Sequence, residues 1–282
     1  MPRVATFQLQ ADPEDPAANL RKVTDSIQHA AAQGAQLAAF PECFLSGYNL
    51  TPEEIEARAE LMPGPLTEAL TQACRRAGIH AIVGSLERDS AGQCYNSAVL
   101  IGPQGLVSKY RKTHLPFLGA DRYLAAGDEL HQPVDTPVGR LGMLICYDLR
   151  FPEPARVLAL RGAQVIVVST AWPVTARLYS DFLARARAAE NAVYLVAANR
   201  VGEERGTRFL GRSIIVAPDG EVLAEAGPTE ETTLLAEIEP SRSDRKRMVF
   251  VPGQYEYDII EDRRPDLYQR LSEELPFHPA ER

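Results

Sequence analysis

One order of secondary-structure elements occurs twice along the chain, and this repeat restricts the fold more than any other feature. In the first half, apolar residues recur every three or four positions over residues 16–32, which predicts a helix. Residues 36–40 form a continuous apolar run, which is typical of a strand that is covered on both faces. The other elements expected in this half are a helix at 65–77 and strands at 4–9, 80–86, 95–101 and 106–112.

The second half repeats this order. Its expected helices are residues 153–161 and 176–190, and its expected strands are residues 141–146, 164–169, 193–198, 213–216, 221–224 and 233–238. The sequence Gly-Ala-Gln opens one strand at Gly34 and the corresponding strand at Gly162. Similar turns end at Gly105 and Gly220. Although α/β chains in general share such an order, two similar halves predict one compact α/β domain with two sheets inside and helices outside.

Composition excludes several classes of protein. The 282 residues include 38 acidic and 30 basic side chains, for a net charge of −8, so we expect neither a nucleic acid nor an anionic membrane as partner. No apolar run approaches the roughly 20 residues that span a bilayer, and no signal peptide follows Met1. The four cysteines form no Cys-x-x-Cys pair, which argues against a metal site and for reduced thiols. We expect a cytoplasmic protein.

The chain changes character near its end. After Arg247 it turns polar and carries four prolines: Pro252, Pro265, Pro276 and Pro279. We therefore expect residues 1–250 to form the domain and residues 251–282 to form a C-terminal tail, which is either disordered or packed on a partner subunit.

Three polar residues lie where apolar strands are expected to end: Glu42, Lys112 and Cys146. Ligands of open α/β sheets bind outside the carboxyl ends of the strands. One such residue means little, but three of complementary chemistry from three different strands predict a site in which they converge.

Cys146 is the candidate nucleophile. It stands between an expected strand and an expected helix, and the positive end of that helix would lower the pKa of the thiol. The backbone N–H groups of such a turn can also hold an oxyanion. The alternative is a small buried core residue, which is the interpretation that we favour for Cys43, Cys74 and Cys94.

Glu42 and Lys112 supply acid–base and charge chemistry. A carboxylate enclosed by apolar residues has a raised pKa, which suits Glu42 as a general base. Lys112 can stabilise an oxyanion. The alternatives are a salt-bridged carboxylate at the rim and a solvated lysine in the cluster Lys-Tyr-Arg-Lys that begins at Lys109. No histidine is marked as catalytic, so a Cys-His protease is not indicated.

Three blocks of sequence resemble the catalytic blocks of the nitrilase superfamily of carbon–nitrogen hydrolases. They are residues 40–48 (FPECFLSGY), 110–115 (YRKTHL) and 145–153 (ICYDLRFPE), with supporting blocks at 187–191, 198–200 and 209–213. The resemblance covers residues 3–250. It implies a four-layer α-β-β-α sandwich, no metal or organic cofactor, and dimers in which helices pair across a two-fold axis and the C-terminal tail crosses to the neighbour.

The resemblance also implies roles. Glu42 would be the base, Lys112 the oxyanion stabiliser and Cys146 the nucleophile that forms a thioester with an amide substrate. The second oxyanion donor would be the backbone N–H of Tyr147. Many family members carry a second glutamate shortly after the lysine block, and here the nearest acid is Asp121, with Glu129 a weaker candidate. Asp121 would position substrate or water, or be a loop acid paired with Arg122.

The substrate class is less determined. The family also cleaves nitriles and N-carbamoyl amines, but residues 147–148 and 199–206 look most like amidases of small aliphatic or omega-amides. Candidate pocket residues are Tyr48, Phe117, Trp172 and Phe209, and for Trp172 a core tryptophan is an equal alternative. We interpret Arg150 as the partner of Asp148 and Glu153 in an ion pair, and Glu190 and Asn191 as residues that brace the site.

Two other classes of function stay open. The first is a catalytically silent binding or scaffold protein, although the complete set of Glu42, Lys112 and Cys146 argues against it. The second is a thiol redox sensor, which would need a resolving cysteine near Cys146, and Cys43 is the candidate.

Overall fold

The computed structural model describes residues 1–273 and divides into two units. The first unit is Met1–Asp244, and the second begins at Arg245. The division lies six residues before the boundary expected at residue 250. Residues 274–282, which the predicted tail includes, lie outside the described residues.

The first sheet contains six strands in the order β14-β1-β2-β3-β4-β5. Their bounds are β1 (Arg3–Gln8), β2 (Leu37–Ala39), β3 (His80–Arg88), β4 (Cys94–Gly102), β5 (Gly105–Arg111) and β14 (Thr232–Glu237). The central strands β1, β2 and β3 are parallel, and the others pair antiparallel. The helices of this half are α1 (Pro16–Ala32), α2 (Pro52–Arg58) and α3 (Pro65–Ala77).

The second sheet also contains six strands, in the order β13-β12-β9-β8-β7-β6. Their bounds are β6 (Val134–Thr136), β7 (Gly139–Ile145), β8 (Val165–Ser169), β9 (Tyr194–Ala198), β12 (Ile214–Val216) and β13 (Val222–Glu225). The helices are α4 (Pro152–Leu160) and α5 (Ala184–Asn191). The helix expected over residues 176–190 is divided, because a π turn at Tyr179–Leu183 precedes α5. A small hairpin, β10 (Glu203–Glu204) and β11 (Thr207–Arg208), follows β9.

The two sheets have the same plan, which confirms the repeat. In each, three parallel strands are followed by an antiparallel hairpin and flanked on the other side by one antiparallel strand. One assignment was wrong: the strand expected at 233–238 belongs by sequence to the second half, but β14 pairs with β1 in the first sheet, with Val4 opposite Ala236. The edge of the second sheet is filled by β6, which the sequence did not indicate.

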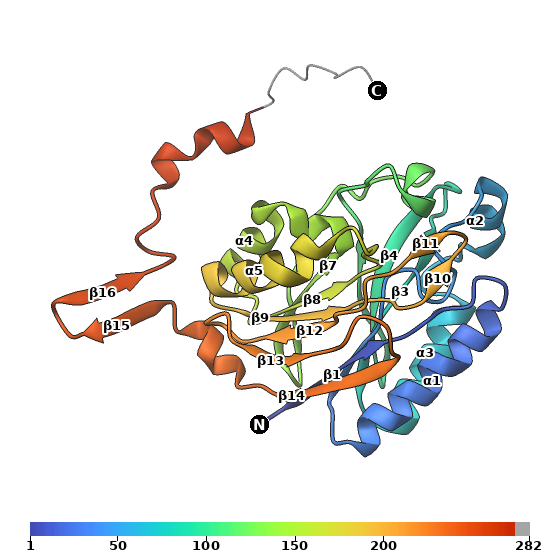
Figure 1. Ribbon diagram of the computed structural model, residues 1–282, viewed down its shortest axis with the longest axis horizontal. Coiled ribbons are helices and arrows are strands. Elements are labelled where there is room, and N and C mark those ends of the chain that lie inside the picture. Colours follow the sequence, from blue (N-terminus) through green and yellow to red (C-terminus); the bar gives the residue numbers. More distant parts are fainter. Residues whose placement is uncertain (274–282) are drawn as a thin grey trace. The chain divides into compact units, whose positions relative to one another are not determined.

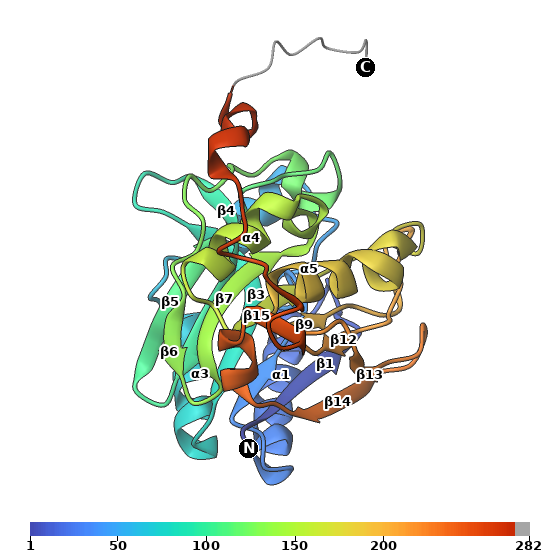
Figure 2. The ribbon, with the colours of Figure 1, turned by 90° about the vertical axis from the view of Figure 1, so that its left-hand side faces the viewer.

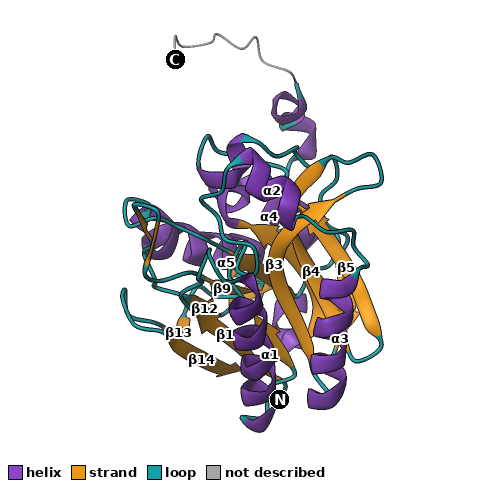
Figure 3. Ribbon diagram, turned by 90° about the vertical axis from the view of Figure 1, so that its right-hand side faces the viewer, coloured by secondary structure: helices purple, strands orange, loops and turns teal. Residues whose placement is uncertain are grey.

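The layers follow from which face of each sheet is apolar. Alternate residues of β2 point to opposite faces, so Leu37 and Ala39 join the cluster between the sheets, whereas Ala38 joins the cluster beneath α1 and α3. Figure 1 shows α4 and α5 outside the second sheet, and Figure 3 shows α1 and α3 outside the first. In Figure 1 the two sheets lie between these two pairs of helices, and Figure 2 views them from the side of α4 and α5. The predicted four-layer α-β-β-α sandwich is confirmed.

The helices begin at the signals that the sequence carries. In α1 the Asp15 side chain accepts a hydrogen bond from the backbone N–H of Ala18, and Pro16 occupies the first turn. The buried face of α1 includes Val23, Ile27 and Ala30, at the spacing that predicted the helix. Within residues 1–273, no helix combines the length and the apolar character that crossing a membrane requires.

The second unit contains an antiparallel hairpin, β15 (Arg247–Val251) and β16 (Tyr255–Asp258). Phe250 stacks on Tyr255 with ring centroids 4.6 Å apart, and Tyr257 lies beside Phe250. All three aromatic side chains are exposed.

Candidate active site

The structure brings Glu42 and Lys112 together in the interior. Glu42 lies three residues beyond β2, and Lys112 directly follows β5. The ammonium Nζ of Lys112 lies 2.6 Å from Oε1 of Glu42, and both side chains are fully buried. Cys146 directly follows β7 in the second sheet, and the charges of Glu42 and Lys112 both act on its thiol. The three candidates therefore meet from three different strands.

The backbone around Glu42 is held by both sheets. Its N–H donates to the carbonyl of Thr170, just beyond β8, over 3.2 Å. On the other side the chain approaches Gly84 of β3 so closely that a Cβ there would lie 2.5 Å from the carbonyl oxygen of Pro41. Only glycine allows this approach, so Gly84 determines where Glu42 stands.

Cys146 stands at a sharp, strained turn. Its φ is 43°, in the left-handed region that non-glycine residues rarely adopt. It begins a 3₁₀ turn, Cys146–Arg150, and α4 begins only at Pro152. The residue is 7% exposed, unlike Glu42 and Lys112, which have no exposed surface. A thiol presented in this way resembles the nucleophile at the strand-to-helix elbow of the α/β-hydrolases.

The pKa shifts show how protons are distributed in the site. Burial raises the pKa of Glu42 above its ordinary value, as expected from the sequence. Burial opposes the charge of Lys112, but Asp121 and Glu42 raise its pKa well above the ordinary value, so it stays an ammonium.

The expected pKa shift of Cys146 was in the wrong direction. Burial, followed by the negative charge of Glu42, raises the pKa of the thiol well above the ordinary value, although Lys112 and the backbone N–H of Ala171 act against this. Because its pKa is raised, the thiol needs a base to become a thiolate.

Asp121 belongs to this cluster. It lies in a 3₁₀ turn, Gly119–Arg122, and its Oδ2 is 2.5 Å from Nζ of Lys112 and 2.9 Å from the hydroxyl of Tyr48. Arg122 donates instead to the carbonyl of Gly119, so the alternative of a loop acid paired with Arg122 does not apply. Lys112 is thus held between two carboxylates.

Asn96, on β4, is a site residue that sequence reasoning missed. Its amide Nδ2 donates to Oε1 of Glu42 over 2.8 Å and to Oδ1 of Asp121 over 2.9 Å, and its Oδ1 accepts from the thiol of Cys43. The available signal in the sequence was a polar amide within a strand whose residues are mostly apolar.

Asp148 connects the loop that follows Lys112 to the end of β7, next to Cys146. It accepts hydrogen bonds from the hydroxyl of Tyr110 (2.9 Å), the backbone N–H of Ile145 (3.0 Å) and the backbone N–H of His114 (3.1 Å). We expected Asp148 to pair with Arg150. Its carboxylate instead accepts hydrogen bonds from the loop around Lys112 and from the end of β7.

The bracing role expected near the end of α5 rests on Arg187. Its guanidinium donates to the carboxylate of Glu190 over 3.0 Å and to the backbone carbonyl of Arg150 over 3.2 Å, and the amide of Asn191 donates to the carbonyl of Arg187. These contacts tie α5 to the turn that carries Cys146.

The four candidate pocket residues divide into two groups. Tyr48, Trp172 and Phe209 are buried near the cluster, and the ring of Trp172 stacks on Tyr179 with centroids 5.2 Å apart. Phe117 is 79% exposed and lies beside Arg122. Contact of any of them with substrate stays a prediction, as does the role of the Tyr147 N–H. In the described part of the chain, no group of three or more His, Cys, Asp or Glu residues is arranged to hold a metal ion.

Comparisons with known proteins agree with this geometry. The family model for carbon–nitrogen hydrolase matches residues 3–248. A nitrilase from Pyrococcus abyssi is 41% identical over 275 residues, which are 96% of this chain and 100% of that protein. Omega-amidase NIT2-A from Xenopus laevis is 40% identical over 89% of this chain and 91% of its own length. A glutamate-to-glutamine mutant of the amidase from Nesterenkonia sp. AN1, with acrylamide added to its active-site cysteine, has a TM-score of 0.83 at 28% identity and covers 96% of this chain and 100% of that one.

Proposed function

Because the chain belongs to the carbon–nitrogen hydrolase family, we propose that it hydrolyses small primary amides, aliphatic amides or omega-amides, to a carboxylate and ammonia through a thioester on Cys146. The observation that carries the proposal is the position of Lys112, whose ammonium lies between the carboxylates of Glu42 and Asp121 and acts on the Cys146 thiol.

The first half-reaction forms the thioester. Glu42 removes the proton of the Cys146 thiol while the sulfur attacks the amide carbon, so that the carbonyl electron pair moves onto oxygen. Lys112 and the backbone N–H of Tyr147 stabilise this oxyanion. Protonated Glu42 then gives the proton to the leaving nitrogen, the carbon–nitrogen bond breaks, and ammonia departs.

The second half-reaction returns the enzyme to its starting state. Glu42 removes a proton from water as the water oxygen attacks the thioester carbonyl, and Lys112 stabilises the second oxyanion. The carbon–sulfur bond breaks, the sulfur recovers its proton, and the carboxylic acid leaves. The raised pKa of Glu42 supports its part in both steps, because a base whose pKa is nearer to neutral also returns its proton readily.

Two relatives support an amide rather than a nitrile or an N-carbamoyl amine. Omega-amidase NIT2-A and the Nesterenkonia amidase act on amides by their names, whereas the Pyrococcus protein is named a nitrilase. Nitrile or N-carbamoyl hydrolysis at the same three residues is the alternative.

The test measures ammonia release from a panel of small primary amides, omega-amides, nitriles and N-carbamoyl amino acids. Wild type and Cys146→Ala are compared, and intact mass spectrometry detects the acyl adduct. We expect release from amides that disappears in the variant. Release from nitriles or carbamoyl compounds alone would overturn the substrate assignment, and no release from any of them would favour a silent binding protein.

We also propose that two copies of the chain assemble and that the second unit packs on the partner subunit. The exposed aromatic side chains of its hairpin, Phe250, Tyr255 and Tyr257, support this, because such a cluster is usually covered. In sedimentation analysis the full chain should be a dimer. The triple variant Phe250→Ser/Tyr255→Ser/Tyr257→Ser should be a more weakly associated dimer or a monomer. A full chain that sediments as a monomer would contradict the proposal.

A further inference from the structure

We propose that Glu204 is a positioning residue for this hydrolysis: it holds the loop of Tyr48 so that the tyrosine hydroxyl stays on Asp121, the carboxylate that orients Lys112. The inference rests on the proposed function, because it concerns the orientation of the oxyanion-stabilising ammonium. The sequence marked residues 199–206 only by their resemblance to amidases, and the connection of Glu204 to Lys112 was not apparent from it.

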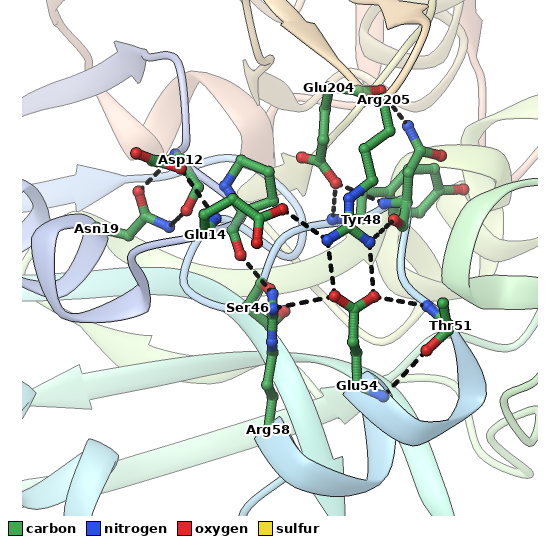
Figure 4. A network of polar contacts seen from close by, with 12 residues as sticks. Asp12, Glu14, Asn19, Ser46, Tyr48, Thr51, Glu54, Arg58, Glu204 and Arg205 are labelled. Atoms are coloured by element: carbon green, nitrogen blue, oxygen red, sulfur yellow. Dashed lines mark hydrogen bonds and ion pairs between the residues drawn. The ribbon is translucent and has the colours of Figure 1, made fainter.

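Glu204 lies at the end of β10 with its side chain fully buried. Its Oε1 accepts two backbone N–H groups of one loop, from Tyr48 over 2.7 Å and from Asn49 over 2.5 Å. Its Oε2 pairs with the guanidinium of Arg200, which is also buried. Figure 4 shows Glu204 directed at the loop of Tyr48. A buried carboxylate with two backbone donors and one counter-ion holds a loop more firmly than a solvated side chain.

Tyr48 transmits this position to the site. Its carbonyl oxygen accepts from the N–H of Ala120, next to Asp121, over 2.7 Å, and its hydroxyl donates to Asp121 over 2.9 Å. The ring lies against Gly119, where a Cβ would be 2.5 Å from a ring carbon and where φ is +52°. The carbonyl oxygen, the ring and the hydroxyl of Tyr48 therefore all contact the turn that contains Asp121.

The same loop has a second attachment that does not reach Tyr48. Arg205 pairs with Glu54 of α2 over 2.6 Å and with Glu14 over 2.6 Å, and its guanidinium donates to the carbonyl of Asn49. These groups are partly exposed, so each ion pair contributes little. This outer cluster supplies a matched control, because it holds the same loop without contacting Tyr48 or the site.

Loss of the Glu204 contacts should change the rate of hydrolysis more than the affinity for substrate. Lys112 stabilises charge that develops only during the reaction, so an ammonium that is displaced by loss of the Tyr48–Asp121 bond lowers kcat more than it raises KM. A purely structural role of Glu204 would instead lower the amount of folded enzyme and leave the kcat of the folded fraction unchanged.

The experiment compares two double variants that differ only in whether residue 204 offers an oxygen to the backbone N–H groups of Tyr48 and Asn49. Changing Glu204 alone would leave Arg200 buried without a counter-ion, so Arg200→Met is combined with Glu204→Gln or with Glu204→Met. Glutamine keeps the oxygen that accepts from Tyr48 and Asn49, and methionine of similar size removes it. Each pair is also made in a Tyr48→Phe background, and Glu54→Gln is the control for the outer cluster.

We expect the methionine pair to have a kcat about tenfold below that of the glutamine pair, with KM changed less. In the Tyr48→Phe background this difference should shrink to less than about twofold, because Glu204 acts through the tyrosine hydroxyl. Glu54→Gln should keep the wild-type kcat within about twofold.

Two results would overturn the inference. The first is equal kcat for the two pairs with both proteins folded by circular dichroism. The second is a difference that persists unchanged in the Tyr48→Phe background. Failure of the proposed function itself is recognised separately, because wild type would then release no ammonia from any amide.

Discussion

The turn that follows β2 and the turn that follows β7 have a similar backbone conformation but differ in the chemistry of their side chains. Each carries a cysteine with a left-handed φ, 45° at Cys43 and 43° at Cys146. Burial raises the pKa of both thiols well above the ordinary value, and Glu42 adds to the shift in both. A left-handed backbone φ and a raised thiol pKa therefore do not identify the nucleophile.

What separates the two thiols is their surroundings. Cys43 has no exposed surface, donates to the amide of Asn96 and packs among apolar side chains. Cys146 keeps a small exposed surface and contacts the backbone N–H of Ala171. In the proposed mechanism the first turn supplies the base and the second supplies the nucleophile, so two similar halves divide the chemistry between them.

The largest expected effect separates the two cysteines. Cys146→Ala should lower kcat by on the order of 10⁴-fold or more, because it removes the group that forms the covalent intermediate. Cys43→Ala should keep activity within about threefold, since within residues 1–273 its thiol makes a single weak hydrogen bond. Steady-state ammonia release measures both. If Cys43→Ala were the inactive variant, the assignment of the nucleophile would be reversed.

The second effect concerns the base in the first turn. Glu42→Gln keeps the shape of the side chain but cannot accept a proton, so we expect kcat to fall by roughly 10²- to 10⁴-fold. In wild type, kcat/KM should rise with pH through a pKa above 4.5, the ordinary value, because Glu42 must be ionised and burial raises its pKa. The rising limb should be absent in Glu42→Gln. An unchanged limb would assign it to another group.

Alkylation sharpens the comparison of the thiols. Only the thiolate reacts with iodoacetamide, and the pKa of Cys146 is raised above 9.0, so its labelling rate should still be increasing at pH 9. Cys43 should be labelled at least about tenfold more slowly in the folded protein, because its side chain is enclosed. Peptide mass spectrometry after timed labelling gives both rates. Equal rates would remove the difference in access on which the comparison depends.

Reversible oxidation provides a further test of the same pair. If Cys43 and Cys146 formed a regulatory disulfide, Cys43→Ser would abolish reversible loss of activity in peroxide while hydrolysis stayed normal. We expect the same peroxide sensitivity in both proteins, since Cys43 is enclosed and bonded to Asn96. Loss of reversibility in the variant would favour the sensor.

The smallest effect is expected from the backbone of the first turn. Gly84→Ala places a Cβ within 2.7 Å of the N–H of Cys43 and of Cα of Glu42, so the turn must move. We expect a loss of about 1–3 kcal/mol in the free energy of unfolding, together with a lower kcat. Urea denaturation and steady-state kinetics test this, and unchanged values for both would show that the turn adapts.

Local patterns predicted most of the fold because they reflect local physics. The apolar spacing of residues 16–32 placed α1 at its observed bounds, the helix expected at 65–77 coincides with α3, and the repeated Gly-Ala-Gln openings marked β2 and β8 as counterparts. The exchange of β14 into the first sheet was not predictable, because a strand sequence does not state which free edge it joins. The pKa of Cys146 was predicted in the wrong direction, because burial is a property of the packed site.

The sequence by itself determined most helices and strands, the repeated order of the two halves and the three polar residues at strand ends. Helix periodicity, strand periodicity and polarity at strand ends all depend on residues that are close together in the chain. Only the tertiary structure decided which further groups act with them. Asn96, Asp121 and Glu204 lie 54, 79 and 162 residues from Glu42 in the chain. The contacts of Asn96 and Asp121 form when the first sheet and its loops assemble, and the contact of Glu204 with Tyr48 joins the β10 hairpin to the first half. Charge, burial and hydrogen bonding depend on distance in space, which a local pattern does not contain.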